Sequence, residues 1–393
     1  MSALRGFRVV ELAERVAGEY CGKLLADFGA EVIKVERPGT GSPTRAMAPL
    51  IEGRAEGENS GLFAYLNTNK KSVALDLTAA GDLDLLEQLV AGADVVIDDH
   101  GEQWLGDRRL GAGARDGRFA STVFCVITPF GLDAPADWSP VESLNVFHAG
   151  GWGYHTPSEA DPERPPLKGA GRFTADYEAA IDAALCVVST LYWRRRSGVG
   201  QTIDISAREV LISRADAVLG RMLAGEAEAS TARTAYDMGG PGAAYRCANG
   251  FVYLMILHSG HWAALKKLMD QPAWMDEFDE TWLEFACTAD LVAKFRAGFA
   301  GWVADREKDQ VSEAAQKLGI PLVPVNDASD LHRSPQFQYR QFFQPLDHPV
   351  LGHALYPTTP YKLSATPAQL VSPAPLLSQH AAEVLGGADR AGA

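Results

Sequence analysis

The chain has 393 residues, 47% of them hydrophobic, and a formal net charge of −14. This length and composition indicate a folded protein with more than one domain rather than a disordered chain. The acidic charge argues against nucleic-acid partners and against binding to anionic membranes. No apolar run is long enough for a signal peptide or a membrane-spanning helix, and the five scattered cysteines form no metal-ligand cluster, so we expect buried free thiols in a reducing cytoplasm.

Strand-forming and helical segments alternate from the start of the chain. We predict strands at FRVVEL (7–12), EVIKVE (31–36), SVALDL (72–77), DVVID (94–98) and TVFCVI (122–127). The first helix is predicted from four residues whose spacing places them on one helical face: Cys21, Leu24, Leu25 and Phe28. Gly29 is expected to end that helix, and a second helix is predicted over 80–91.

A longer helix is predicted over 177–195, followed by a strand at TIDIS (202–206) and a further helix over 207–224. Repeated strand–helix–strand units imply parallel strands joined by right-handed crossovers. The predicted fold class is therefore α/β, with an open parallel sheet and helices on both faces forming a large domain over residues 1–225.

The sequence changes character beyond the predicted large domain. A glycine-rich loop leads to a hairpin around Asn249-Gly250, aromatic-rich helices follow, and GIPLVPVND (319–327) is typical of a buried strand. We assign residues 226–325 to a smaller α+β domain. The proline-rich remainder is predicted to be extended, and we expect residues 326–393 to return to the large domain.

Several common ligand-binding motifs are absent. The first βα turn, ELAERVAGEYCG, holds only Gly18 and Gly22 where dinucleotide enzymes carry a glycine-rich fingerprint, so neither a nicotinamide nor a flavin cofactor is expected. A GxSxG elbow and a P-loop are also lacking. No histidines show zinc-ligand spacing, so no metal is expected, and we interpret four of them as structural or surface residues: His148, His155, His258 and His261.

Asp176 lies at the start of the long predicted helix. Aspartate is a favoured helix N-cap, so a purely structural role is one interpretation. The same position suits an ionised carboxylate surrounded by backbone donors, which is a competent nucleophile toward a thioester. The following helix face is made of small residues, which leave room for a bulky ligand: Ala179, Ala180, Ala183 and Ala184. From these residues alone, both interpretations stay open.

Seven segments carry a resemblance that spans the chain. They are LRGFRVVELAERVAGEYCGKLLADFGAEVIKVERPGTGSPTR (4–45), LNTNKKSVALDL (66–77), ADVVIDD (93–99), VITPFG (126–131), FTADYEAAIDAALCVVSTLYWRRRSGVGQTIDIS (173–206), GIPLVPVND (319–327) and HPVLGHALYP (348–357). In this order they resemble the class III CoA-transferases, the formyl-CoA and carnitine CoA-transferase group that also contains the α-methylacyl-CoA racemases. The combination of segments is specific, whereas no single one is.

The resemblance implies a CoA-transferase in which Asp176 attacks an acyl-CoA thioester and forms an aspartyl anhydride and then an aspartyl-CoA thioester. It implies a Rossmann-like large domain, a small domain and an interlocked homodimer. Backbone amides near Gly239 and Gly240, in a shortened relative of the family's glycine loop, are expected to shield the anhydride from water.

Coenzyme A is the expected substrate group, and its phosphates need local cations on this acidic chain. We expect the following residues to contact it: Val16, Ala17, Gly18, Arg37, Lys70, Lys71, Asp99, His100 and Arg108, or Arg109 in place of the last. Arg37 is expected to matter most, because a guanidinium grips phosphate in bidentate fashion.

The sequence departs from the family pattern in places. The racemases' His-Asp step is Val141-Glu142 here, so a racemase, the first alternative, would need Glu142 or His148 as its second base. Asp99-His100 replaces a common Asn-Phe step, which bears on acyl specificity. A family glycine four residues past Asp176 is Ala180 here, and the Ala180 and Glu178 changes motivate the second alternative, a non-catalytic CoA-binding protein.

Overall fold

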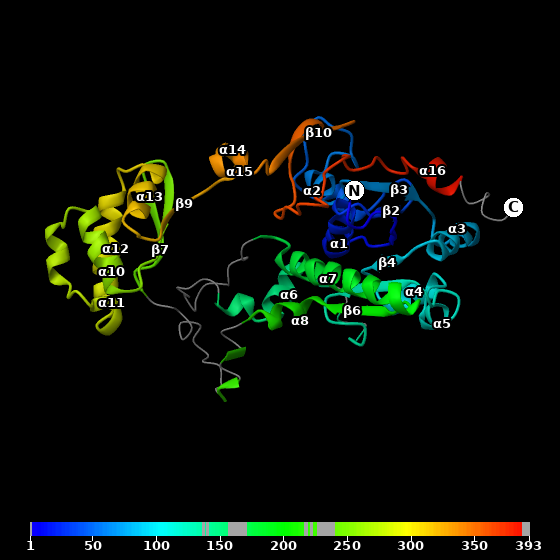
Figure 1. The fold of residues 1–393 in the computed structure, drawn as a ribbon, viewed down its shortest axis with the longest axis horizontal. Helices are drawn as coiled ribbons and strands as arrows, with labels where there is room; N and C mark the ends of the chain where they lie inside the picture. Colours follow the sequence, from blue (N-terminus) through cyan, green and yellow to red (C-terminus); the bar gives the residue numbers. More distant parts are fainter. Residues whose placement is uncertain are drawn as a thin grey trace. The chain divides into compact units, whose positions relative to one another are not determined.

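The computed structural model shown in Figure 1 describes residues 2–135, 138, 141–155, 171–215, 219–220, 223–225 and 240–386. These residues form two compact units. The first comprises the described residues up to 225 together with 341–386, and the second comprises 240–340. Residues 326–340 therefore cluster with the second unit.

A six-stranded sheet with the order β3-β2-β1-β4-β5-β6 forms the centre of the first unit. All of its strand pairs are parallel. The strands are β1 (Arg8–Glu11), β2 (Glu31–Glu36), β3 (Lys70–Ala74), β4 (Val95–Asp98), β5 (Val123–Thr128) and β6 (Thr202–Ser206). The α/β prediction is confirmed. The strands lie within one residue of their predicted bounds, except the third, which begins at Lys70 and ends at Ala74. The strand order reverses between β1 and β4, and ligands bind at the carboxyl ends of strands at such a switch point.

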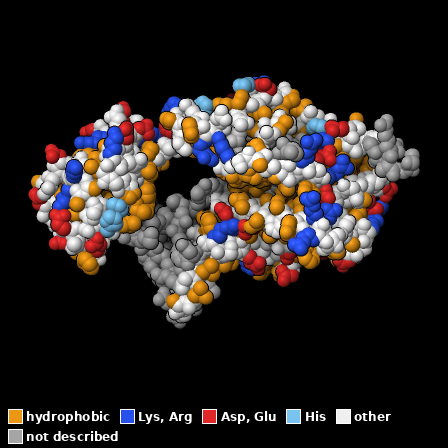
Figure 2. Space-filling view, in the orientation of Figure 1, with side chains coloured by type: hydrophobic (Ala, Val, Ile, Leu, Met, Phe, Trp, Pro, Cys, Tyr) orange, Lys and Arg blue, Asp and Glu red, His pale blue; other side chains and the backbone are white. Residues whose placement is uncertain are grey.

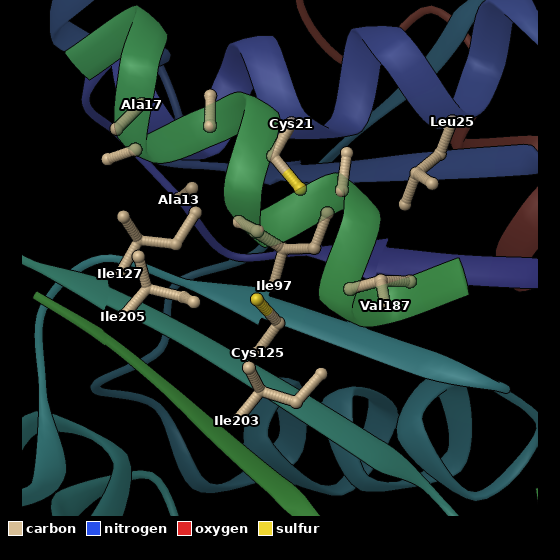
Figure 3. Close-up of a cluster of buried hydrophobic side chains, with 14 of the residues drawn as sticks. Ala13, Ala17, Cys21, Leu25, Ile97, Cys125, Ile127, Val187, Ile203 and Ile205 are labelled. Atoms are coloured by element: carbon tan, nitrogen blue, oxygen red, sulfur yellow. The ribbon is translucent and has the colours of Figure 1, made fainter. Parts of the chain in front are cut away.

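Helices cover both faces of this sheet because its strand residues are apolar on both sides. Val9 and Val32 pack with α1 (Val16–Asp27), α6 (Ser143–Ala149), α7 (Thr174–Ser197) and α8 (Ala207–Ser213). Their neighbours Val10 and Ile33 pack on the opposite face with α3 (Ala80–Ala91), α4 (Glu102–Asp107) and α5 (Ala112–Asp116). Figure 3 shows the first of these cores, where Cys21 on α1 points toward Cys125 on β5.

The C-terminal segment returns to the first unit. It contains an antiparallel hairpin of β10 (Phe343–His348) and β11 (Gly352–Pro357) and the helix α16 (Ala381–Leu385), so the prediction of an entirely extended tail is wrong. The helix α2 (Gly61–Leu66) lies in the same unit. The Gln369 N–H donates to the Asp27 carbonyl at 2.9 Å, and the His380 N–H donates to the Ser72 carbonyl at 3.0 Å. These bonds tie the tail to α1 and β3.

The second unit is an antiparallel three-stranded sheet packed with helices. Its strands are β7 (Ala243–Cys247), β8 (Gly250–Leu254) and β9 (Leu322–Val325), and its helices are α10 (Ser259–Leu268), α11 (Trp282–Phe285), α12 (Ala289–Val303), α13 (Lys308–Lys317), α14 (Ala328–Arg333) and α15 (Pro335–Tyr339). The hairpin turn falls where predicted. The expectation of a fully buried last strand is wrong, because Val323 and Val325 are 47% and 45% exposed.

None of the described helices is both long and apolar enough to cross a membrane. All five cysteines are free thiols. Cys21, Cys125 and Cys247 are buried, whereas Cys186 is half-buried and Cys287 is exposed, so the expectation of burial is wrong for Cys287.

Candidate active site

Asp176 is the third residue of α7. It is not the helix cap, because Phe173 occupies that position and makes no side-chain capping bond. Burial raises the pKa of the Asp176 carboxyl, while the Ser143 hydroxyl and the charge of Arg15 act in the opposite direction. The carboxyl is therefore less exposed than a surface nucleophile would be, and its charged form is less well solvated.

Three cavities meet at the carboxyl ends of β1 and β4. The smallest, about 20 Å³, lies between Asp176, Arg15 and Ser143 and has room for roughly one water molecule. A second, of about 320 Å³, is lined by Asp176 together with Arg37 and His100. The third, of about 510 Å³, shares Arg15 and His100 with the second. The predicted nucleophile and the predicted phosphate-binding arginine thus line the same cavity.

Asp99 and His100 follow directly after β4. The Asp99 carboxylate is buried and accepts hydrogen bonds from the backbone N–H groups of Glu14 and Arg15, at 3.0 and 2.7 Å. Burial raises the pKa of Asp99 to about 7. Gly18 allows this close approach, since a Cβ at that position would lie 2.9 Å from an Asp99 carboxylate oxygen.

His100 is held as an imidazolium at neutral pH. Burial favours the uncharged ring, but the carboxylates of Asp98 and Glu14, at 2.9 and 3.2 Å, outweigh it and raise the pKa of His100 to about 10. The His100 ring also stacks on Trp104 with a centroid separation of 3.9 Å. The guanidinium of Arg108 lies 4.0 Å from the same Trp104 ring. A histidine, a tryptophan and an arginine therefore form one cationic and aromatic group.

Arg37 belongs to the same neighbourhood. Its side chain is 61% exposed, and its Nε donates to a Glu14 carboxylate oxygen at 2.6 Å. Glu14 also contacts His100, so it links two of the predicted CoA-binding cations. Val16 and Ala17 begin α1 and are both buried; Val16 lines the cavity of about 320 Å³, and Ala17 lines the smallest one.

The structure contradicts the prediction that Lys70 contacts CoA. Its ammonium is fully buried and donates to Glu11 at 2.7 Å, to the Glu19 carbonyl at 2.7 Å and to Asn67 at 2.9 Å. A group that is enclosed and fully satisfied in this way has no donor to offer a ligand. Lys71 points elsewhere and pairs with two carboxylates near the C-terminal helix, those of Glu31 and Glu383.

Other predicted positions lie apart from this group or beyond the described residues. Arg109 pairs with Asp84 on α3 at 2.8 Å, which leaves Arg108 as the arginine near Trp104. Gly239 lies outside the described residues. Gly240 belongs to the second unit, where its carbonyl accepts a hydrogen bond from Arg296 at 2.6 Å. The role expected for this loop stays a prediction.

Sequence reasoning missed Arg15, Ser143 and Trp104. The Ser143 hydroxyl is buried near the Asp176 carboxyl, whose pKa it lowers, and Ser143 lines two of the cavities with Asp176. Ser143 and Trp104 belong to no recognisable sequence motif. Arg15 could have been considered from its place immediately before the first helix, at the switch point of the sheet.

Comparison with known proteins identifies the family and the fold. The model of CoA-transferase family III matches residues 4–381. The chain belongs to CoA-transferase family III. It is 26% identical to mouse succinyl-CoA:glutarate CoA-transferase, over 98% of this chain and 86% of that protein. It is 29% identical to the succinate–glutarate CoA-transferase of Agrobacterium fabrum, over 97% of this chain and 94% of that protein.

Solved structures agree with this assignment. A CAIB/BAIF family protein from Brucella suis superposes with a TM-score of 0.83 at 26% identity, covering 99% of this chain and 100% of that one. The resemblance to class III CoA-transferases is therefore confirmed, and the protein is an enzyme of this family whose substrates are CoA thioesters.

Proposed function

We propose that this CoA-transferase moves CoA from an acyl-CoA to a carboxylic acid with Asp176 as the nucleophile. The observation that carries the proposal is that Asp176 and Arg37 line the same cavity at the switch point of the sheet. Such a cavity suits a ligand with a reactive thioester at one end and phosphates at the other.

The first half of the reaction uses only this carboxylate and the thioester of the substrate, whose sulfur leaves as the CoA thiolate and then attacks in turn. An Asp176 oxygen attacks the thioester carbon, the C–S bond breaks, and a mixed anhydride and CoA thiolate form. The thiolate then attacks the aspartyl carbonyl carbon and releases the donor acid as its carboxylate. Asp176 now carries CoA as a thioester, and the energy of the original thioester is retained.

The second half reverses these steps with another acid. The acceptor carboxylate attacks the aspartyl thioester and displaces the thiolate, which gives a second mixed anhydride. The thiolate attacks the acceptor's carbonyl carbon, so the new acyl-CoA leaves and the Asp176 carboxylate is restored. No net proton is consumed. The buried setting that raises the pKa of Asp176 also supports nucleophilic attack, since a poorly solvated carboxylate is more reactive.

We assign CoA binding to the cationic groups that line the cavity of about 320 Å³ or lie beside it. Arg37 and the imidazolium of His100 line it, and Arg108 lies beside them on Trp104. We propose that these three groups meet the phosphates. Asp99 would then fix the segment that leads into α1, because it accepts hydrogen bonds from the N–H groups of Glu14 and Arg15, rather than contact CoA through its charge.

Substitution of Asp176 tests the proposal. Asp176→Ala and Asp176→Asn should abolish transfer while CoA still binds, as measured by mass-spectrometric exchange and by calorimetry. Full exchange activity in Asp176→Ala would contradict the mechanism. Tight CoA binding with no exchange in the unmodified enzyme, across a broad panel of acids, would favour a non-catalytic role.

The racemase alternative needs Glu142 or His148 as its second base, and of these two Glu142 lines the same cavity as Asp176. In this structure the Glu142 side chain forms a capping box with Asn145 at the start of α6. A carboxylate engaged in this way is a poor candidate for a mobile second base. Deuterium incorporation at the α-carbon without any acceptor acid would favour the racemase.

We also propose that the protein is a homodimer, as the family resemblance implies, and that it works in the cytoplasm, which suits its free thiols. Four apolar side chains form an exposed stripe along one face of α7: Ile181 (46%), Leu185 (64%), Val188 (42%) and Tyr192 (68%). Figure 2 shows hydrophobic side chains gathered over this helix. A stripe of this kind usually meets a partner, so Leu185→Glu should lower the mass measured by light scattering.

A further inference from the structure

Arg15 occupies an unusual place at the site. It is the residue immediately before α1, and its backbone N–H donates to Asp99 at 2.7 Å, which fixes the point from which its side chain extends. It lines all three cavities described above. Its charge also acts on Asp176, whose pKa it lowers against the effect of burial. Arg15 is thus a cation close to the proposed nucleophile.

The Arg15 guanidinium lacks the carboxylate partner that most arginines at this end of the sheet possess. Its Nη1 donates to the Val141 carbonyl at 3.2 Å, and among the described residues it forms no ion pair within 4 Å. By contrast, Arg37 pairs with Glu14, and Arg45 pairs with Glu36 and Glu58. A guanidinium has five N–H donors, so Arg15 retains donors for a ligand.

The surroundings of Arg15 limit what that ligand can be. Asp99 and Glu142 line the smallest cavity together with Asp176, and Glu14 lines the next one. These carboxylates repel a second negative charge on the reacting acid unless a cation compensates for it. Val141 in the smallest cavity, with Phe130 and Trp138 in the largest, adds apolar surface for a short carbon chain.

We propose that Arg15 binds the remote carboxylate of the acid that reacts at Asp176, and that the enzyme is thereby selective for dicarboxylic acids and their mono-CoA thioesters. This inference rests on the proposed function, since it takes Asp176 as the point of reaction. When the reacting carboxyl of a short diacid lies at Asp176, its other carboxylate is only a few carbon atoms away. That distance brings the second carboxylate toward Arg15. The buried Ser143 hydroxyl, which acts on the Asp176 carboxyl, also lies at the reacting end. Arg15 acts here as a specificity-determining residue.

A matched series of thioesters tests this directly. Succinyl-, glutaryl- and adipoyl-CoA would be compared with butanoyl-, pentanoyl- and hexanoyl-CoA, which differ within each pair only in the remote carboxylate. The release of the donor acid in a single turnover, before any acceptor is added, follows the first half-reaction, in which CoA moves to Asp176, and gives kcat/KM for that half-reaction. The unmodified enzyme should prefer the diacid thioester for at least one chain length.

Arg15→Gln should lower kcat/KM for the preferred diacid thioester by about 10- to 100-fold, the range for a hydrogen bond to a charged group. Its monoacid counterpart should be unchanged. Arg15→Lys should restore part of the preference, because lysine keeps the charge without the planar donor array. Arg5→Gln serves as the control, since Arg5 is an exposed arginine that lines none of the three cavities.

Several outcomes would overturn the inference. One is an equal loss for all six thioesters in Arg15→Gln, which would assign Arg15 to the CoA phosphates or to folding. Another is the absence of any diacid preference in the unmodified enzyme. Asp176→Ala distinguishes a failure of the proposed function from a failure of this inference. If Asp176→Ala releases the donor acid at the normal rate, the proposed function fails; if it is inert and Arg15→Gln keeps the preference, only the role of Arg15 fails.

Discussion

Two groups of charged side chains lie near α1 and differ in how completely they are paired. The buried ion-pair network comprises Glu11, Glu19, Lys34, Glu36, Arg45 and Lys70, none of which is more than about 2% exposed. Lys34 contacts Glu11 at 3.1 Å and Glu19 at 2.8 Å. Every charge in this network has an opposite charge beside it.

The charged groups that line the cavities are arranged differently. Arg15 has only a carbonyl as its side-chain hydrogen-bond partner, and Arg37 is mostly exposed. Asp176 has the Ser143 hydroxyl and the charge of Arg15 near it, but it forms no ion pair within 4 Å among the described residues. Exposure, as for Arg37, or the lack of an ion-pair partner, as for Arg15, leaves a charged group accessible to a ligand, whereas burial with complete pairing fixes the fold. Position in the sequence does not separate the two classes, because Glu36 and Arg37 are adjacent and belong to different ones.

The largest expected effect comes from breaking the buried network. Lys34→Met leaves Glu11 and Glu19 without their shared cation, and removing one partner of a buried pair costs about 3–5 kcal/mol. Urea unfolding should show this loss in the free energy of unfolding. An unchanged midpoint would mean that the network is not essential for stability.

Arg37→Ala should act on binding instead. We expect CoA affinity to fall by about 1.5 to 3 kcal/mol, the range for a hydrogen bond to a charged group, while kcat at saturating acyl-CoA changes much less. Since Arg37 is 61% exposed, the unfolding midpoint should stay close to that of the unmodified enzyme. A lower kcat with an unchanged KM for acyl-CoA would place the cofactor elsewhere.

Asp99→Asn tests the intermediate case of a buried carboxylate that lines the cavities. The pKa of Asp99 is raised to about 7 from an ordinary value of 3.8, so the folded protein holds this proton more tightly than the unfolded chain. Stability should therefore fall as pH rises from about 4 to about 7, and Asp99→Asn should remove that part of the fall. Asn keeps only one of the two acceptor oxygens, so the net gain at pH 8 should be modest. Denaturant unfolding of both proteins at pH 5 and pH 8 measures the difference, and equal pH dependence would contradict this account.

The smallest effect is expected at Lys71. Its side chain is 28% exposed and pairs with Glu31 and Glu383 on the surface of the first unit. Surface ion pairs of this kind contribute about 0–1 kcal/mol. Lys71→Ala should change neither the affinity for CoA nor the unfolding midpoint beyond that range. A loss of CoA affinity comparable to that in Arg37→Ala would restore the original prediction for this residue.

Much of the sheet was predictable because its strands and helices carry strong local patterns. EVIKVE and TIDIS match β2 and β6 residue for residue, and the helix over 80–91 matches α3. The hairpin within the proline-rich tail was missed because its two strands are mostly exposed or half-buried and lack an apolar run.

The site was predictable only in part, because pairing depends on tertiary contacts. Asp176 and Arg37 were identified through the family resemblance, and the structure brings both to one cavity. Lys70 was misassigned because a lysine in a polar segment looks like a surface charge, whereas Glu11 lies far away in the sequence and encloses it. Arg15 was missed because nothing local distinguishes an unpaired arginine from a paired one.

The most direct measurement is the identity of the residue that carries the covalent intermediate. The enzyme would be incubated with an acyl-CoA donor, quenched, treated with hydroxylamine and digested for peptide mass spectrometry. We predict a hydroxamate on Asp176 in the α7 peptide, present only after incubation with the thioester and absent in Asp176→Asn. A modified residue elsewhere, or rapid CoA exchange with no adduct at Asp176, would contradict the account.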